Sequence, residues 1–376
     1  MAWRETFLVH FGPGLLGGIT LGDWLKLLRE QRFAISPSCL TRAISITVQS
    51  VRNSVLRKRE EARFRAGLED AVIQPPLFVL GHWRNGTTHL HNLLAIDRRF
   101  AFPNNYQVSF PHIFLSSEER STRWLRFLLP PQRPMDNIRW NLASPQEDEF
   151  ALSATCVKSP CMGWVFPRRQ QCFDKYLTMR AVSEEEIADW RAALTRFLKK
   201  LTLKYARPIV LKSPPHTCRI RLLLELFPEA RFVHIHRNPY DVFQSSRWMF
   251  KVTSRWHRLQ RPCRGLKAER RFDNWVLRQY QEMYEAYFEE RSLVPKGHHC
   301  EICFEELEQD PVGQIRRVYE TLGLPQFEIV QPDLEEYVAS VAGYRKNSFP
   351  MLPDELRSRI AHEWRVCFEE WGYPLK

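Results

Sequence analysis

The loop Gly-His-Trp-Arg-Asn-Gly-Thr-Thr-His at residues 81–89 has the composition of an anion-binding site. An apolar run at 76–80 predicts a short buried strand before it, and leucines at helical spacing over 90–94 predict a helix after it. At such a junction, backbone N–H groups and the positive end of the helix dipole converge on a phosphate. The glycines have P-loop spacing, but Thr87 stands in place of the P-loop lysine. That difference argues against an ordinary ATPase or GTPase.

Three further polar segments follow predicted strands, at the end where open α/β sheets bind their ligands. One short strand ends at Lys212. Another, at 231–236, leads into Arg237, and Ser245 follows eight residues later. A third ends at Phe304, just before an acidic pair. Because the ends of parallel strands meet at one edge of a sheet, we expect these segments to face the same ligand.

These segments, in this order, resemble the donor site of the sulfotransferase family. Residues 84–88 are similar to the family's 5′-phosphosulfate loop, and 231–245 are similar to its 3′-phosphate motif. Lys212 stands like the family's catalytic lysine at a strand end, and 304–311 resembles its Tyr-Glu-Asp segment. Pro214 occupies the place of the histidine that cytosolic members use as a base. The chain therefore resembles the bacterial-type and tyrosylprotein-like branch more than the cytosolic type.

The resemblance spans roughly residues 75–350 and implies 3′-phosphoadenosine 5′-phosphosulfate (PAPS) as the donor and co-substrate. This donor has no β- or γ-phosphate, so there is little need for a P-loop lysine or Mg²⁺, and we expect no metal site. The loop would hold the 5′-phosphate, while Arg237 and Ser245 would hold the 3′-phosphate. The donor-binding residues that the resemblance implies are Arg84, Asn85, Gly86, Thr87, Thr88, His89, Arg237, Ser245, Phe304, Arg345 and Lys346.

Lys212 is the expected catalytic residue, because a positioned cation stabilises the charge that develops in a loose transition state. The general base stays open among three residues. His216 is the histidine nearest to Lys212, and no glutamate occurs shortly after the first loop, where tyrosylprotein-type members have theirs. Asp148 and Glu149 are the best substitutes, with Glu149 slightly favoured. Equally, both could be exposed acids in the first turn of a helix that begins at Ser144.

Strands that alternate with helices over 75–325 predict a mainly parallel sheet covered on both faces, as in a three-layer P-loop-like α/β fold. We expect a helical N-terminal extension at 1–72 and the sulfotransferase α/β domain at 73–376. Caps and apolar periodicity predict helices at 38–70, 183–205, 267–291, 311–322 and 353–371.

The stretches 101–140 and 160–176 are rich in aromatic residues and proline, which predicts a pocket wall for an apolar or amphipathic, lipid-like small-molecule acceptor. Nine scattered cysteines, an odd number, indicate free thiols and a reducing, cytoplasmic location. Residues 7–28 are fairly apolar but too interrupted to span a membrane. They predict either packing against the main domain or peripheral membrane contact.

Two other functions remain open from the sequence. A nucleotide kinase would share the fold, but it needs the lysine that Thr87 replaces. A non-enzymatic protein that binds nucleic acid or a membrane surface would use the net charge of +12 and the basic loop 255–265. The donor-site resemblance favours an enzyme with no nucleic-acid partner. No sequence feature specifies an oligomeric state.

Overall fold

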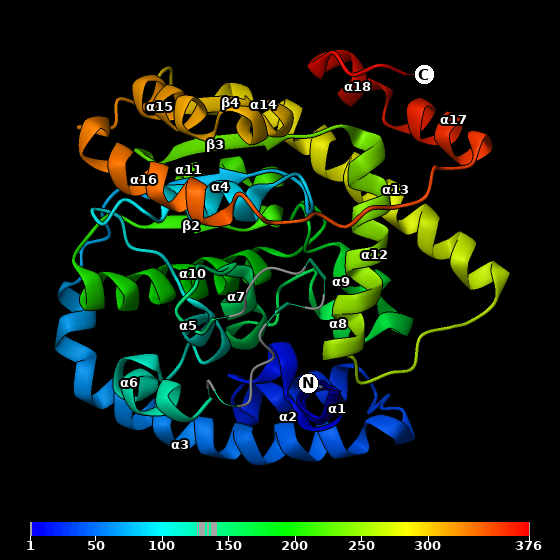
Figure 1. The fold of residues 1–376 in the computed structure, drawn as a ribbon. Helices are drawn as coiled ribbons and strands as arrows, with labels where there is room; N and C mark the ends of the chain where they lie inside the picture. Colours follow the sequence, from blue (N-terminus) through cyan, green and yellow to red (C-terminus); the bar gives the residue numbers. More distant parts are fainter. Residues whose placement is uncertain (1, 126, 128–131, 134, 137–140, 376) are drawn as a thin grey trace. The chain divides into compact units, whose positions relative to one another are not determined.

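A computed structural model describes residues 2–125, 127, 132, 133, 135, 136 and 141–375 (Figure 1). The chain forms two compact units. The first unit comprises residues 1–74, 102–207 and 250–263, and the second comprises 75–101, 208–249 and 264–376. The division into a helical extension at 1–72 and an α/β domain at 73–376 stays a prediction.

The second unit is built on a parallel sheet of four strands. They are β1 (Leu77–Leu80), β2 (Val210–Lys212), β3 (Arg231–His236) and β4 (His299–Cys303). Their order is β2-β1-β3-β4, with Val79 opposite Lys212 and Leu80 opposite His234. Near-continuous apolar runs such as that of β1 are typical of parallel strands buried on both faces. The α/β class and the four strands predicted from the sequence are confirmed.

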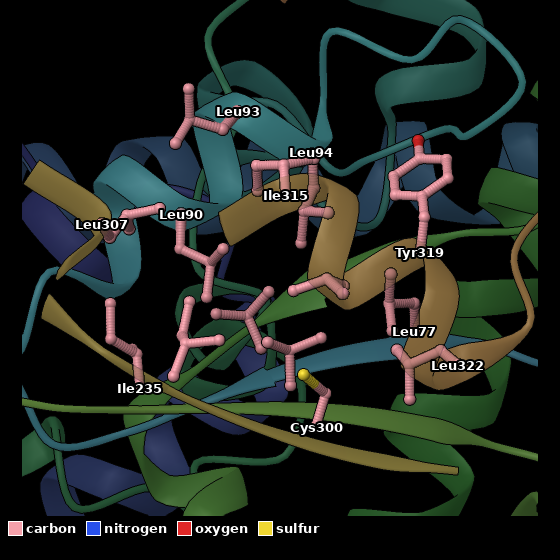
Figure 2. Close-up of a cluster of buried hydrophobic side chains, with 14 of the residues drawn as sticks. Leu77, Leu90, Leu93, Leu94, Ile235, Cys300, Leu307, Ile315, Tyr319 and Leu322 are labelled. Carbon is pink, nitrogen blue, oxygen red and sulfur yellow. The ribbon is translucent and has the colours of Figure 1, made fainter. Parts of the chain in front are cut away.

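One face of the sheet is covered by α4 (Thr87–Leu94), α14 (Phe304–Gln309), α15 (Pro311–Leu322) and α16 (Phe327–Val341). Figure 2 shows Leu90 of α4 and Leu322 of α15 on the side that faces strand residues such as Ile235 and Cys300. Leu90, Leu93 and Leu94 lie at helical spacing, so a single stripe of α4 is removed from water. This packing fixes the start of α4 against the end of β1.

On the opposite face lie α11 (Ile220–Leu226), α13 (Leu266–Glu290), α18 (Arg365–Trp371) and the 3₁₀ helix η4 (Pro214–Cys218), and α17 (Asp354–Glu363) packs against α13. Phe78 stacks on Phe232 with ring centroids 5.6 Å apart, and His234 stacks on Tyr287 at 4.2 Å. Helices therefore lie on both faces of the sheet, as the three-layer prediction required. α12 (Pro239–His257) begins directly after β3.

The first unit is helical. A buried ion pair of 2.6 Å joins Lys200 of α10 to Glu60 of α3. The predicted capping box of α10 is confirmed: Ser183 accepts from the Glu186 N–H, and the Glu186 side chain accepts from the Ser183 N–H. Its helices are α1 (Ala2–Phe11), α2 (Leu21–Glu30), α3 (Leu40–Asp70), α5 (Asn105–Ser109), α6 (Phe114–Leu125), α7 (Glu149–Thr155), α8 (Met162–Val165), α9 (Gln171–Asp174) and α10 (Glu184–Tyr205).

Short 3₁₀ helices complete the connections of the chain. They are η1 (Gly14–Leu16), η2 (Pro37–Cys39), η3 (Pro167–Arg169) and η5 (Arg291–Leu293). Among the helices of the described ranges, none has both the length and the apolar composition required to cross a bilayer. None of the nine cysteines, all within the described ranges, forms a disulfide.

Three element boundaries differ from the sequence-based expectation. The helix expected from Ser144 begins instead at Glu149, because Pro145 forms a β-bridge with Asn104 and the Gln146 N–H donates to the Pro103 carbonyl at 2.9 Å. The helix expected over 353–371 is broken at Trp364 into α17 and α18. α12 continues to His257, so the basic loop starts later than expected.

Candidate active site

The loop 81–89 runs from the end of β1 into α4 and is shaped by two glycines. Gly86 has φ +97°, and a Cβ there would lie 2.2 Å from the Phe304 ring. Gly81 has φ +136°, and its N–H donates to the Thr217 hydroxyl at 2.7 Å. Only glycine combines this backbone with so close a neighbour. The loop is therefore held in one shape, with its N–H groups at the start of α4.

A buried tyrosine of α13 supports the same loop from behind. The Tyr284 hydroxyl accepts from the His82 N–H at 3.2 Å and from the Asn85 amide at 2.7 Å. The Asn85 amide also donates to the Ile235 carbonyl at 3.0 Å, which ties the loop to β3. Burial raises the pKa of Tyr284 well above its usual range, so the hydroxyl stays protonated. The Asn85 side chain thus shapes the loop, and its contact with a donor stays a prediction.

Two arginines meet where the loop approaches α12. Arg84 has the left-handed φ of +76°, and its Nε donates to the Ser245 hydroxyl at 2.8 Å. Arg237 donates to the Arg84 carbonyl and to Asp241, each at 3.3 Å. Its guanidinium carbon lies 4.4 Å from the centroid of the Phe304 ring. The residues predicted to bind the 5′-phosphate and those predicted to bind the 3′-phosphate are far apart in sequence. These contacts make them adjacent within the second unit.

The Arg237 side chain also contains a donor that forms no hydrogen bond within the described chain. Its Nε is buried and has no hydrogen-bond partner among the described residues. Leaving a buried charged donor without a partner costs free energy, and an anion is the natural way to recover it. Because the Gly86 loop, Ser245 and this Nε gather at one sheet edge, the residues present fit a ligand with more than one phosphate position.

Lys212 lies at the end of β2, where the sheet register places it beside the loop. Its side chain is almost fully buried, and its Nζ is 3.4 Å from the Thr88 hydroxyl. Thr87 and Thr88 are the first residues of α4. A cation held at the positive end of this helix strengthens the local field for an anion.

The three candidates for the general base lie in different parts of the chain. His216 is in the second unit, fully buried in η4, with its ring edge-on to Phe78 at 5.4 Å. Asp148 and Glu149 are in the first unit, at the start of α7. Both are fully buried, so the alternative that they are exposed first-turn acids is wrong. Their role as a base stays a prediction.

Of the remaining predicted donor residues, Lys346 lies near Phe304. Lys346 lies 5.4 Å from the Phe304 ring and donates to Glu308 at 2.7 Å. Arg345 is exposed. His89 is half-buried, and burial lowers its pKa although the charge of Glu308 opposes the shift. Among the residues that the structure describes, no group of three or more His, Cys, Asp or Glu is arranged to hold a metal ion.

The turn that carries Arg237 is held by Glu305 and Tyr373, a role that the sequence did not indicate. Glu305 accepts from the Asn238 N–H at 3.1 Å, at the point where β3 turns into α12. Tyr373 donates to the same carboxylate at 2.9 Å and lies 3.0 Å from His236 Nδ1. Burial lowers the pKa of His236 to about 4, so this ring is neutral at pH 7. Glu305 lies in a motif noted from the sequence, but the distant Tyr373 gives no local signal.

Replacing Tyr373 with phenylalanine is expected to weaken binding of 3′-phosphoadenosine 5′-phosphate (PAP), the nucleotide that the donor implied by the resemblance would leave, about three- to tenfold. The lost hydroxyl would free Glu305 and loosen the turn that places Arg237. Calorimetry would measure the dissociation constant, and donor KM should rise while kcat changes little. Tyr344→Phe, at an exposed tyrosine, is the control. A lowered melting temperature with unchanged PAP affinity would make Tyr373 purely structural.

Comparison with known proteins identifies the family of this chain. A model of the sulfotransferase family, Sulfotransfer_3, matches residues 75–328. The omega-hydroxy-beta-dihydromenaquinone-9 sulfotransferases Stf3 of Mycobacterium tuberculosis and Mycobacterium bovis are each 36% identical over 373 residues, covering 99% of this chain and 93% of theirs.

Two solved structures share the fold. Sulfotransferase STF9 of Mycobacterium avium has a TM-score of 0.66 at 19% identity, over 89% of this chain and 87% of its own. STF1 of Mycobacterium tuberculosis has a TM-score of 0.65 at 16% identity, over 92% of each chain.

Proposed function

Because the chain belongs to the sulfotransferase family and is a sulfotransferase, we propose that PAPS is its donor and that a hydroxyl of an apolar or amphipathic, lipid-like molecule is its acceptor. The observation that carries the choice of donor is the buried, unpartnered Nε of Arg237 beside the Arg84–Ser245 pair. A donor with one phosphate in the loop and another at Arg237 would bind the Arg237 Nε and the loop at the same time. A nucleoside triphosphate has its phosphates in one chain and would leave the Nε of Arg237 without a hydrogen bond.

In this proposal the loop and the two arginines bind the donor, and Lys212 acts on the reacting atoms. PAPS supplies a sulfuryl group joined to its 5′-phosphate. In an in-line transfer, the acceptor oxygen bonds to sulfur as the sulfur–oxygen bond to the 5′-phosphate breaks, which leaves PAP. Lys212, beside Thr88, stabilises the negative charge that gathers on the departing phosphate.

The acceptor hydroxyl must lose its proton as the new bond forms. Glu149 is our first candidate for the base, with Asp148 and His216 as the others. All three side chains are buried, where an acid–base group is shielded from water.

The acceptor class rests on two supports. The relatives named above act, by their name, on a menaquinone derivative, which is a lipid-like molecule. In the first unit, the stretch predicted to form a pocket wall contributes an aromatic group in which Trp164 contacts Phe150 and Phe250 at 6.2 and 6.1 Å. Aromatic and apolar side chains of this kind are typical of sites for apolar ligands.

A thermal-shift comparison of PAP, Mg²⁺–ATP and NAD tests the proposed donor. At a concentration of about 100 times its dissociation constant, PAP is expected to add about 2.7 kcal/mol and raise the melting temperature by about 3 °C. The other two ligands should give no comparable shift, because neither provides phosphates at both positions. A larger shift with Mg²⁺–ATP, together with its hydrolysis, would favour the kinase alternative instead.

A further inference from the structure

The long helix α3 exposes a row of aliphatic side chains and buries several polar ones. Its buried face includes Arg42, Asn53 and Glu60 beside the apolar Ala43, Ile46 and Leu68. Its outward side bears the α3 stripe, which we define as five aliphatic side chains that are 47–65% exposed: Leu40, Ile44, Val48, Val51 and Val55. These residues recur every three or four positions, so they form one line about 22 Å long. Contiguous exposed apolar surface of this kind marks an interaction site.

The buried polar residues of α3 show that this orientation is fixed by specific contacts. Arg42 donates to the Arg258 carbonyl at 2.9 Å. The Asn53 amide donates to the carbonyls of Gly17 and Ile19 at 2.8 and 3.0 Å. With Glu60 bound to Lys200, the helix cannot rotate its aliphatic stripe inward without breaking these bonds.

Charge around the α3 stripe indicates what covers it. Exposed cations continue along the outward side of α3, namely Arg52, Lys58, Arg59, Arg63 and Arg65. The acids of the same stretch are neutralised, because Glu60 is buried against Lys200 and Glu61 pairs with Arg57 and Arg196. The exposed acids Glu69 and Asp70 lie at the far end of the helix. An apolar strip bordered by Lys and Arg is complementary to an anionic lipid surface.

Aromatic residues of α1 extend this surface at the start of the stripe. The Thr41 hydroxyl of α3 donates to the His10 carbonyl at 3.1 Å and so ties the end of α1 to the start of α3. On α1, the exposed rings of Phe7 and Phe11 stack 5.4 Å apart. Figure 1 shows α3 along the outer edge of its unit, with α1 near one part of it. The membrane contact expected at 7–28 would thus use only part of that segment, since Trp24, Leu27 and Leu28 are buried.

We propose that the outer face of α3 docks the protein on the surface of an anionic lipid bilayer. Such a surface satisfies both parts of the face, since its acyl region takes the aliphatic side chains and its headgroups take the cations. A second copy of the protein would supply apolar surface to the stripe but no anions to the cations. This inference does not depend on the identity of the donor or the acceptor.

Co-sedimentation with vesicles tests this inference. The wild-type protein is expected to bind phosphatidylcholine vesicles that contain phosphatidylglycerol, and to bind more weakly as salt increases. Replacing Val48, Val51 and Val55 together with glutamine should weaken this binding by about tenfold or more, because each exposed side chain loses its apolar contact. Ile329→Gln removes an aliphatic side chain of equal exposure on α16 and should bind like the wild type.

Two further measurements make the result decisive. A variant that lacks three of the cations should lose the preference for phosphatidylglycerol. It combines Arg52→Gln, Arg59→Gln and Arg63→Gln. Each variant should keep the wild-type melting temperature without any ligand, which shows that it is folded and keeps this test separate from that of the donor. Equal vesicle binding by the valine variant and the wild type would overturn the proposal. Ultracentrifugation gives a second outcome that would overturn it: a wild-type protein that is dimeric and a valine variant that is monomeric. The stripe would then be an interface between copies.

Discussion

Lys212→Ala is expected to lower kcat about 100- to 1,000-fold while the affinity for PAP changes little. The lysine lies at the end of β2, with its Nζ beside Thr88 at the start of α4, where negative charge would gather on the departing 5′-phosphate. That charge is larger in the transition state than in the bound donor, so loss of the lysine lowers turnover more than it lowers donor affinity. Single-turnover rates with PAPS, alongside calorimetry with PAP, would separate the two quantities.

The matched control is Lys199→Ala, at a lysine on the helical first unit that donates to the Glu69 carbonyl. It should retain wild-type turnover. Suppose instead that Lys212→Ala raises the dissociation constant of PAP and leaves kcat intact. Lys212 would then be a binding residue, and the assignment of catalysis to it would fail.

Arg237→Ala is expected to raise the dissociation constant of PAP by about 100-fold or more, because it removes a largely buried, charge-assisted contact. The guanidinium lies over Phe304 and has its Nε directed to no protein partner in the described chain. Arg237→Lys should recover only part of the affinity, since an ammonium lacks the fork and stacks less well on the ring. Isothermal calorimetry with PAP measures both variants.

Arg247→Ala is the control, on the helix that follows Arg237, because that arginine is bound by Asp273 at 2.5 Å and Glu269 at 3.0 Å. It should cost some stability and leave PAP binding unchanged. Wild-type affinity in Arg237→Ala would contradict the proposed 3′-phosphate site and, with it, the choice of PAPS as donor.

The parts of the fold that the sequence predicts are those set by neighbouring residues. The capping box at Ser183 begins α10, and Gly323, in the left-handed conformation, ends α15. Apolar runs and the polar residues after them predict all four strands and the loop at their ends. Such features depend on backbone geometry and on contacts a few residues apart, so a single sequence contains them.

The parts that the sequence does not predict depend on distant contacts. The Trp364 ring stacks on Tyr280 at 3.7 Å and donates to the Leu277 carbonyl at 3.0 Å, at the point where the expected C-terminal helix breaks. The support of the loop by Tyr284 and of the Arg237 turn by Tyr373 spans well over a hundred residues in sequence. The exposure of the α3 stripe was likewise not predicted, because periodicity alone does not say which face of a helix is buried.

The left-handed backbone of Arg84 has a consequence for engineering. A non-glycine residue at φ +76° costs roughly 1 kcal/mol or more relative to glycine or asparagine at that position. The loop keeps arginine there, with its Nε held by Ser245, at the expense of folding stability. Stability and function are thus opposed at this residue. A search for thermostable variants that scored only the folded state would select glycine at position 84 and discard a charge that the proposed donor needs.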